Sequence, residues 1–470
     1  MVWHRVVRQR EVPVLTNITQ LSIFNKKTNL MFNQMFKFLS LSVALIFSQV
    51  VHAAPEIQTW KTSQGIPVYF VNAPELPMID INIVFDAGSS RDADQSGLAM
   101  LTTGLLSQGA AGMNADQISQ GFESLGAVYG SDTGYDSSSV SLRSLTDKTL
   151  LDAAMANFKK VIAQPDFPEE ALERRRSRTL IGIRSKQQSP GSLARDAFMG
   201  SVFKNHPYAL PNEGTEESIK AITRNDVSQF HQQYFVANNA MIAMVGAVDT
   251  EQAKAIAEEL GGVFPQGEKP AVLPNVNQLQ QAETVFIEHP SQQTHILIGQ
   301  PGVKRGDPDH FALYVGNHVL GGGGMVSRLF EEVREKRGLS YSAYSYFSPL
   351  RFKGPFIAGL QTKTEQVEEA KKVLMENIQR FIDQGPTEAE LEASKKNITG
   401  GYPLRIDSNG KILSYVTVIG YYGLPLDYLE TFNDKVSAVT IEDIKDAFKR
   451  RLSPDKMITV MVGTPEQEDS

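Results

Sequence analysis

The chain carries one pattern twice, and this repeat constrains the fold more than any other feature. The apolar run MIAMVG at residues 241–246 returns as MITVMVG at residues 457–463. A helix-like segment with a capping signal precedes each run, starting at Thr223 in the first case and at Thr440 in the second. The sequence therefore predicts two homologous halves.

Other parts of the pattern also occur in pairs and in the same order. Each half has a strand-like run leading to a glycine, a strand pair, a long helical stretch, and a helix start beside a proline. The paired segments are 81–88 and 295–302, 137–145 and 341–361, 147–163 and 364–383, and the starts at Pro168 and Pro386. Mixed strands and long helices favour an α+β fold, with a layered mixed or antiparallel sheet and helices in each half of a clam-shell.

A Pro/Gly-rich polar stretch between the halves is typical of a linker. We place the linker at residues 265–280, the first half at residues 54–264 and the second half at residues 281–470. The length of 470 residues and the hydrophobic content of 41% are ample for a core in each half.

Residues 1–53 are expected to lie outside the fold, as a signal peptide. The apolar run at residues 36–51 is followed by Val51-His52-Ala53, which fits a signal-peptidase site. The run is short for a membrane span, so no stable span is expected after cleavage, although an N-terminal anchor is the alternative. Met31 and Met35 lie just upstream of the run, so the basic stretch before them is a possible misassigned start.

The composition narrows the compartment and the partners. The chain has no cysteine, which excludes disulfides, and an exported cysteine-free chain points to the periplasm of a Gram-negative-type bacterium. The formal net charge is −7, and residues 1–53 hold six of the basic residues and one of the acidic residues, so the mature charge would be −12. An acidic chain argues against nucleic acid or an anionic membrane surface as a partner.

Four stretches together carry a family resemblance that spans nearly the whole mature chain. They are Ala87–Asp92 with Ser96–Ala99, His206–Tyr208, Tyr234–Asn239, and Leu320–Phe330 continuing through Arg334–Ser342. On these stretches the chain resembles the insulinase/pitrilysin-type zinc metallopeptidases, in particular their short bacterial branch. It is also similar to mitochondrial processing peptidase and respiratory core subunits.

The resemblance implies a zinc site whose ligands this chain lacks. In active members, two histidines on one helix face and a distal glutamate bind zinc, and a second glutamate is the general base. The histidine positions are Met100 and Gly104 here, the base position is Thr103, and the distal position is Gly182. We therefore expect no metal and no other cofactor to be bound by this chain.

The remaining histidines do not offer a replacement site. No pair has the i, i+4 spacing of a helical zinc motif, and each histidine is expected to be structural or on the surface, with His206 shaping a turn. The six in the mature chain are His206, His231, His289, His295, His310 and His318. An active enzyme with a relocated metal is thus a weak third hypothesis.

The resemblance also implies substrate-binding residues in the second half. Arg334 and Tyr341 occupy the positions of an Arg/Tyr pair that binds substrate backbone and polarises the scissile carbonyl, and both side chains can donate to a carbonyl oxygen. The alternative is a solvated arginine and a core tyrosine. The glycine run Gly321, Gly322, Gly323 and Gly324 lacks the lysine of a phosphate loop, so flexible backbone near the interface of the two halves is expected, and we assign the four glycines to substrate binding with Arg334 and Tyr341.

Two further stretches have an ordinary and a functional interpretation. The basic cluster at residues 174–178 favours a solvated helix face over a docking patch. The alternating residues 341–347 favour an ordinary strand, although such a strand can add an extended peptide at its edge.

The short bacterial relatives implied by the resemblance work as heterodimers, in which one chain carries zinc and the other carries the Arg/Tyr pair. This chain is similar to the second kind. The leading hypothesis is a non-catalytic, substrate-binding subunit of a periplasmic heteromeric zinc metalloendopeptidase, with peptide substrates and with zinc on a homologous partner. The rival is a proteolytically inactive scaffold or peptide-binding protein. Neither the partner nor the choice between homo- and hetero-oligomer follows from the sequence.

Overall fold

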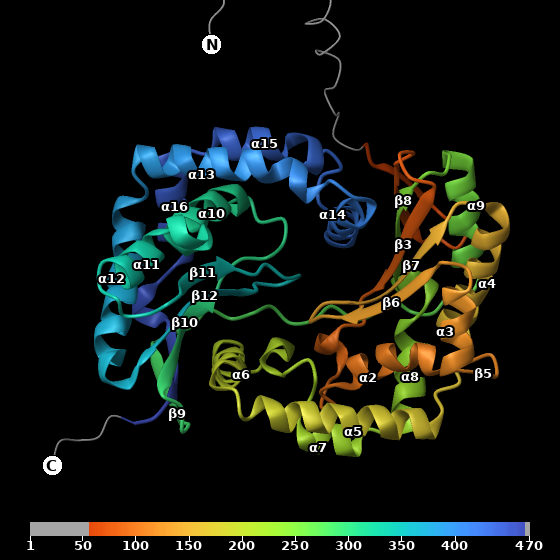
Figure 1. Ribbon diagram of the computed structural model, residues 1–470, viewed down its shortest axis with the longest axis horizontal. Coiled ribbons are helices and arrows are strands. Elements are labelled where there is room, and N and C mark those ends of the chain that lie inside the picture. Colours follow the sequence, from red (N-terminus) through yellow and green to blue (C-terminus); the bar gives the residue numbers. More distant parts are fainter. Residues whose placement is uncertain (1–55, 466–470) are drawn as a thin grey trace, which may run out of the picture. The chain divides into compact units, whose positions relative to one another are not determined.

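Two β-sheets with their helices make up residues 56–465, the part of the chain that the computed structural model describes (Figure 1). The predicted signal peptide lies outside the described residues. Between residues 56 and 465, no helix has both the length and the apolar character needed to cross a membrane. The α+β fold with two halves is confirmed.

The first sheet has six strands in the order β1-β2-β8-β3-β7-β6. All neighbouring strands are antiparallel except β2 and β8, which are parallel. Its central strand β8 is buried along its whole length, because helices cover both faces of the sheet. The strands are β1 (Gln58–Lys61), β2 (Pro67–Asn72), β3 (Met78–Phe85), β6 (Val128–Thr133), β7 (Ser138–Leu145) and β8 (Ala240–Gly246). A small hairpin lies apart, formed by β4 (Gly109–Ala110) and β5 (Met113–Asn114).

The second sheet repeats this topology with five strands in the order β11-β12-β10-β13-β9. Here β13 and β9 form the parallel pair, as β8 and β2 do in the first sheet. The strands are β9 (Glu283–Glu288), β10 (Gln293–Pro301), β11 (Ala343–Phe347), β12 (Pro355–Lys363) and β13 (Ile458–Gly463). The runs at residues 241–246 and 457–463 thus lie in corresponding strands, as the repeat predicts.

The helices also correspond between the halves, and most begin where the sequence predicts. Thr223, Thr387 and Thr440 cap their helices through reciprocal capping boxes, which satisfy backbone N–H groups of the first turn. In the first half the helices are α2 (Leu98–Leu105), α3 (Ala115–Glu123), α4 (Lys148–Ala163), α5 (Glu169–Lys186), α6 (Pro190–Val202), α7 (Glu216–Ala221), α8 (Arg224–Tyr234) and α9 (Thr250–Gly261). In the second half they are α10 (His310–Asn317), α11 (Arg328–Phe330), α12 (Val367–Gln384), α13 (Glu388–Gly401), α14 (Asn409–Tyr422), α15 (Tyr428–Ala438) and α16 (Ile441–Arg451), with π-helical turns η5 (His318–Gly322) and η7 (Glu331–Glu335).

The two halves exchange one helix each. Helix α6 belongs to the first half in sequence but packs on β10 and β13 of the second sheet, while α14 belongs to the second half but packs on β8, β3 and β2 of the first sheet (Figure 1). Phe198 and Phe203 of the α6 region are fully buried against Val460 and Ile357 of the second sheet. This exchange buries apolar surface across the two halves, so they stabilise each other.

A buried polar contact adds to this link. The carboxylate of Asp136 accepts hydrogen bonds from the Tyr208 hydroxyl, from the Tyr422 hydroxyl at 2.8 Å and from the Arg351 backbone N–H at 2.7 Å. Its backbone carbonyl accepts a further bond of 2.6 Å from the Tyr421 hydroxyl. Both chain segments before and after the linker therefore converge on one aspartate.

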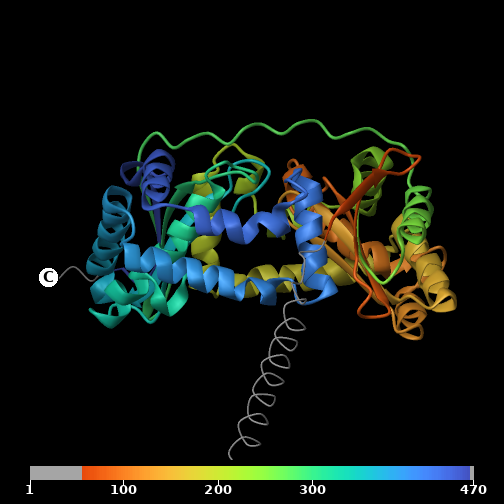
Figure 2. The ribbon, with the colours of Figure 1, turned by 90° about the horizontal axis from the view of Figure 1, so that it is seen from above.

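One predicted strand pair needs correction. Residues 137–145, predicted as a pair of strands, form the single strand β7, and its hairpin partner is β6 at Val128–Thr133. Strand β6 was missed because it lies at the sheet edge, where its residues VYGSDT are mostly exposed and show no apolar alternation. Residues 265–282, which include the predicted linker, have no helix or strand and run along one side of the unit (Figure 2).

Candidate functional site

Helix α2 carries three of the positions that the resemblance assigns to the metal site. It begins after Gly97, whose φ of 95° is accessible mainly to glycine. The buried carboxylate of Asp92 accepts hydrogen bonds from the backbone N–H groups of Gly97 at 2.7 Å and Ala99 at 2.8 Å. Burial raises the pKa of Asp92 to about 7. These contacts fix the start of the helix.

Thr103, at the position of the general base, belongs to the scaffold. It is buried, and its hydroxyl donates a 2.9 Å hydrogen bond to Ser138 Oγ, which in turn donates to the Ala87 carbonyl at 2.7 Å. A hydroxyl group bonded in this way cannot act as a base towards water at neutral pH. The structure thus gives Thr103 a role in packing α2 against β7.

The space beside Gly104, where a histidine side chain would lie in active relatives, is occupied by an arginine from another helix. The guanidinium of Arg175, on α5, lies so close to Gly104 that a β-carbon added there would overlap it. The second histidine position is therefore filled by a cation from the neighbouring helix. The close approach requires glycine at position 104, because any larger side chain must displace Arg175.

Met100 and Gly182 line one pocket of about 580 Å³ between α2 and α5. Arg175, Arg178 and Lys186 line the same pocket, so its charged groups are mainly basic. A zinc ion needs several thiolate, imidazole or carboxylate ligands. Over residues 56–465 no group of three His, Cys, Asp or Glu residues could hold a metal, and the residues at this pocket do not fit zinc.

Arg334 and Tyr341 are in direct contact in the second half. The guanidinium carbon of Arg334 lies 4.3 Å from the centroid of the Tyr341 ring and 4.8 Å from that of Phe330. Such stacking holds a guanidinium in a fixed plane while leaving its N–H groups available. Tyr341 is 73% exposed, so the expectation of a core tyrosine does not apply. Neither residue lines the pocket at Met100 and Gly182.

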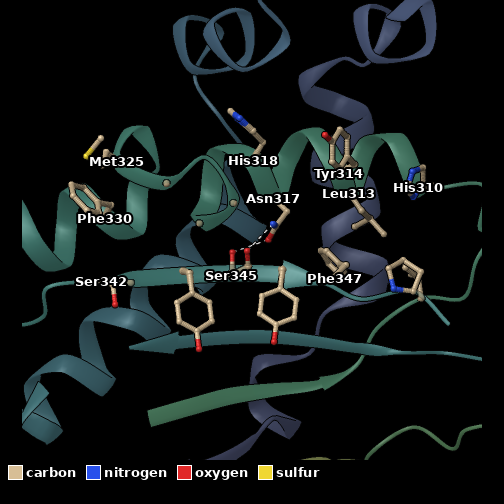
Figure 3. A pocket seen from close by; sticks show the side chains of 18 of the residues that line it. His310, Leu313, Tyr314, Asn317, His318, Met325, Phe330, Ser342, Ser345 and Phe347 are labelled. Carbon is tan, nitrogen blue, oxygen red and sulfur yellow. Dashed lines mark hydrogen bonds between the residues drawn. The ribbon is translucent and has the colours of Figure 1, made fainter. Parts of the chain in front are cut away.

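The glycine run borders a second pocket, of about 670 Å³ (Figure 3). Gly321, Gly322 and Gly324 line it, and Gly323 lies against the backbone of His318. At Gly321 a β-carbon would come within 2.5 Å of Ser345 Oγ, so only glycine lets this turn approach strand β11. The rest of the wall is largely aromatic and aliphatic, and includes Leu313, Tyr314, Met325, Phe330, Tyr344, Tyr346 and Phe347.

Strand β11 forms the floor of this second pocket and is an edge of its sheet. Asn317 Nδ2 donates to the Ser345 carbonyl at 2.9 Å and the Ser345 hydroxyl donates to Asn317 Oδ1 at 2.7 Å, as the dashed lines in Figure 3 show. The rings of Tyr344 and Tyr346 stack with centroids 5.9 Å apart. Ser345 thus faces the turn at Gly321, and the alternating side chains Tyr344 and Tyr346 stack on the other face of the strand.

Arg195 is a residue that sequence reasoning missed. It comes from the exchanged helix α6, and its Nη1 donates a 2.7 Å hydrogen bond to the Tyr346 hydroxyl. Arg195 also lines a small pocket of about 220 Å³ with Ser342 and Tyr344. No local signal could have found it, because the contact depends on which sheet α6 covers.

The histidines have structural contacts. His206 caps the turn at Pro207–Ala209 by accepting the Tyr208 backbone N–H at 3.1 Å, so the predicted turn is confirmed. His231 and His310 are paired with the Ile162 carbonyl and the Tyr428 hydroxyl, and burial lowers the pKa of each to about 4. Their pKa values favour neutral rings within the fold at neutral pH.

Comparison with known proteins agrees with this geometry. Residues 68–216 match the family model described as Insulinase (Peptidase family M16), and residues 221–398 match Peptidase M16 inactive domain. A solved structure described as a peptidase M16 inactive domain from Pseudomonas fluorescens is 38% identical, with a TM-score of 0.85, and the match covers 88% of this chain and 99% of that one.

Two curated relatives extend the comparison. The "Non-peptidase homolog YmxG" of Helicobacter pylori is 28% identical over 409 residues, which cover 86% of this chain and 93% of that protein. An "Uncharacterized zinc protease" of Rickettsia bellii is 26% identical over 397 residues, covering 83% and 94%. The inactive-domain match and the first name support a non-catalytic chain. These matches and the internal repeat show that the chain belongs to the insulinase family, peptidase family M16, although its first half does not fit zinc.

Proposed function

We propose that this chain is the non-catalytic, substrate-binding subunit of a periplasmic heteromeric zinc metalloendopeptidase. Its zinc-bearing partner is a homologous chain, and Arg334 and Tyr341 complete the partner's active site. Peptides are the substrates. The name of the Helicobacter pylori relative, a non-peptidase homolog, supports the absence of catalysis by this chain itself.

One observation carries the proposal: the metal positions of the first half hold no ligand side chain, with Thr103 and Gly104 engaged in packing, whereas the Arg/Tyr pair is assembled and accessible. Arg334 stacks between Tyr341 and Phe330 and has no carboxylate partner within residues 56–465. Its N–H groups are thus available to an acceptor from outside the chain. A stacked arginine beside an exposed phenol suits a developing oxyanion or a peptide carbonyl.

The surface around this pair supports contact with another polypeptide. Met325 is 74% exposed and lines the second pocket together with Phe330, and the neighbouring Val326 is 78% exposed. Clustered exposed apolar side chains of this kind mark interaction sites in soluble proteins. Strand β11 lies at an edge of its sheet, where an extended peptide can add as a further strand.

The test is the peptidase activity of the complex carrying Arg334→Ala. We expect activity to fall at least about tenfold without loss of assembly, because a charged hydrogen bond in the transition state is removed. Arg334→Lys should not restore activity, since an ammonium group cannot stack or donate as a planar fork. The matched control is Arg337→Ala on the same segment, whose guanidinium pairs with Glu332 at 2.7 Å.

Size-exclusion chromatography separates the possible outcomes. A complex that stays assembled and loses activity supports the proposal. A complex that falls apart would assign Arg334 a structural role, and full activity in an assembled complex would contradict the donation of Arg334. The exposed apolar patch itself also favours the second candidate function, a scaffold or peptide-binding protein, for which Arg334 and Tyr341 are dispensable.

A further inference from the structure

The pocket between α2 and α5 has an unusual charge balance. It is lined by Arg175, Arg178 and Lys186, and its one acidic lining residue is Glu213. Glu213 is already paired with Lys186, which also bonds Asp196 at 2.8 Å. Lys186 is therefore neutralised, and the two arginines set the character of the pocket.

The other basic side chains of α5 have partners. Arg176 donates to the Ile222 carbonyl at 2.7 Å and to Glu173 at 3.0 Å. Arg184 is bonded to Glu216 at 3.2 Å. The basic cluster at residues 174–178 is therefore not a uniformly solvated helix face, because some of its side chains, such as Arg176, bond to other parts of the chain.

Arg175 and Arg178 have no hydrogen bond and no ion pair among the described residues of the chain. The Nε of Arg175 is buried without a partner, although a buried guanidinium normally uses its donors. Burial, together with the nearby charge of Arg178, lowers the pKa of Arg175. Two adjacent cations that lack a counter-charge at a pocket are a site for an anion.

We propose that this pocket binds the C-terminal carboxylate of a peptide through Arg175 and Arg178. Arginine forks match a planar carboxylate with two parallel hydrogen bonds. The apolar side chains of Met100 and Ile183 offer a surface for the last side chain of the peptide, and hydroxyl groups of Ser189 and Ser192 complete the lining. Where active relatives hold a metal cation, this chain holds guanidinium groups.

The experiment is isothermal titration calorimetry on the isolated mature chain with an acetylated hexapeptide as its free acid. We expect Arg175→Ala to weaken binding at least about tenfold, since a charge-assisted bidentate contact is lost. The same loss is expected when the C-terminus of the peptide is amidated. Gly104→Ala should also weaken binding, because its β-carbon displaces the Arg175 guanidinium while the charge is retained.

The matched control is Arg174→Ala on the same helix, an exposed residue whose nearest carboxylate, Glu170, is 3.9 Å away. It should leave binding within about twofold, as expected for an exposed, solvent-screened charge that does not line the pocket. An equal loss in this control, or equal binding of the amidated peptide, would overturn the proposal. Inorganic phosphate tests the other source of an oxyanion: binding of phosphate that needs Arg175, without binding of the free acid, would overturn the assignment to a carboxylate.

Circular dichroism spectra of each variant establish that it is folded before binding is compared. The inference does not depend on the proposed function, because the titration uses this chain without a partner. If the peptide does not bind this pocket, the proposed role of Arg334 in a complex is not affected. If the Arg334 test fails, the proposed carboxylate site is not affected.

Discussion

Two pockets border corresponding helices of the repeat, α2 and α10, but have opposite characters. The first pocket lies between α2 and α5 and is basic, with Met100 and Gly182 at the family's ligand positions. The second lies between the turn η5 and strand β11 and is lined mainly by apolar and aromatic side chains. The two halves thus share a fold, but their pockets differ in charge and polarity.

The helices behind these pockets differ in the same way. Arg175 of α5 inserts a cation against Gly104 of α2. In the second half, neutral groups of α13 face η5: His318 Nδ1 pairs with Ser394 Oγ at 3.0 Å and Nε2 with Asn397 Oδ1 at 3.2 Å. The comparison teaches that corresponding helices of a repeat can border pockets of different charge, because a few neighbouring side chains decide that charge.

The largest expected effect tests whether the halves form one folded unit. Asp136→Ala should lower the free energy of unfolding by about 3 kcal/mol or more, because it leaves the buried Tyr208 and Tyr422 hydroxyls and the Arg351 N–H without their acceptor. Urea denaturation measures this loss. Asp152→Ala, which breaks an exposed pair with Lys148, should leave the midpoint nearly unchanged. Equal midpoints for both variants would show that Asp136 does not link the halves.

The second prediction concerns the pH dependence of stability at the start of α2. The folded pKa of Asp92 is raised from 3.8 to about 7, so the native state retains a proton that the unfolded chain releases. This contribution is fully present below about pH 4 and is lost as the pH rises towards 7, by an amount on the order of a few kcal/mol. Denaturation of Asp92→Asn across this window should show a flatter pH dependence than the natural chain, whereas Asp94→Asn should not. Parallel curves for all three proteins would contradict the raised pKa.

The third prediction compares glycines of α2 and α10. A β-carbon at Gly316 would meet the Phe448 and Ile444 side chains of the core at 2.6 and 2.8 Å, so Gly316→Ala should cost about 1–3 kcal/mol of stability. At Gly104 the obstacle is the end of a flexible arginine, and alanine favours a helix, so Gly104→Ala should change stability by less than about 1 kcal/mol. Thermal unfolding of the two variants distinguishes these cases. A Gly104→Ala variant that loses as much as Gly316→Ala would mean that Arg175 is rigidly held.

Much of the framework could be predicted from the sequence because its signals are local. The capping threonines, the apolar strands at 241–246 and 457–463 and the linker each depend on residues within a few positions. The missing ligands Met100 and Gly104 were recognised through the family resemblance. Neither methionine at position 100 nor glycine at position 104 can bind zinc as histidine does, so the sequence alone identifies the loss of these ligands.

What the sequence could not predict depends on long-range packing. The exchange of α6 and α14 places one helix of each half on the sheet of the other half, and neither helix carries a local sign of its destination. In the sequence Arg175 is one member of a basic cluster, and only the structure shows that it lies against Gly104. Arg195 became part of the β11 surface for the same reason. The roles of Arg334, Tyr341 and the four glycines in substrate binding stay predictions.

The most direct test of the account is the peptidase activity of the mature chain, assayed alone and as the complex that co-purifies with it. The account predicts no cleavage by the chain alone, because the α2–α5 pocket does not fit zinc, and chelator-sensitive cleavage by the complex. Chelator-sensitive cleavage by the chain alone, with stoichiometric zinc bound, would contradict it.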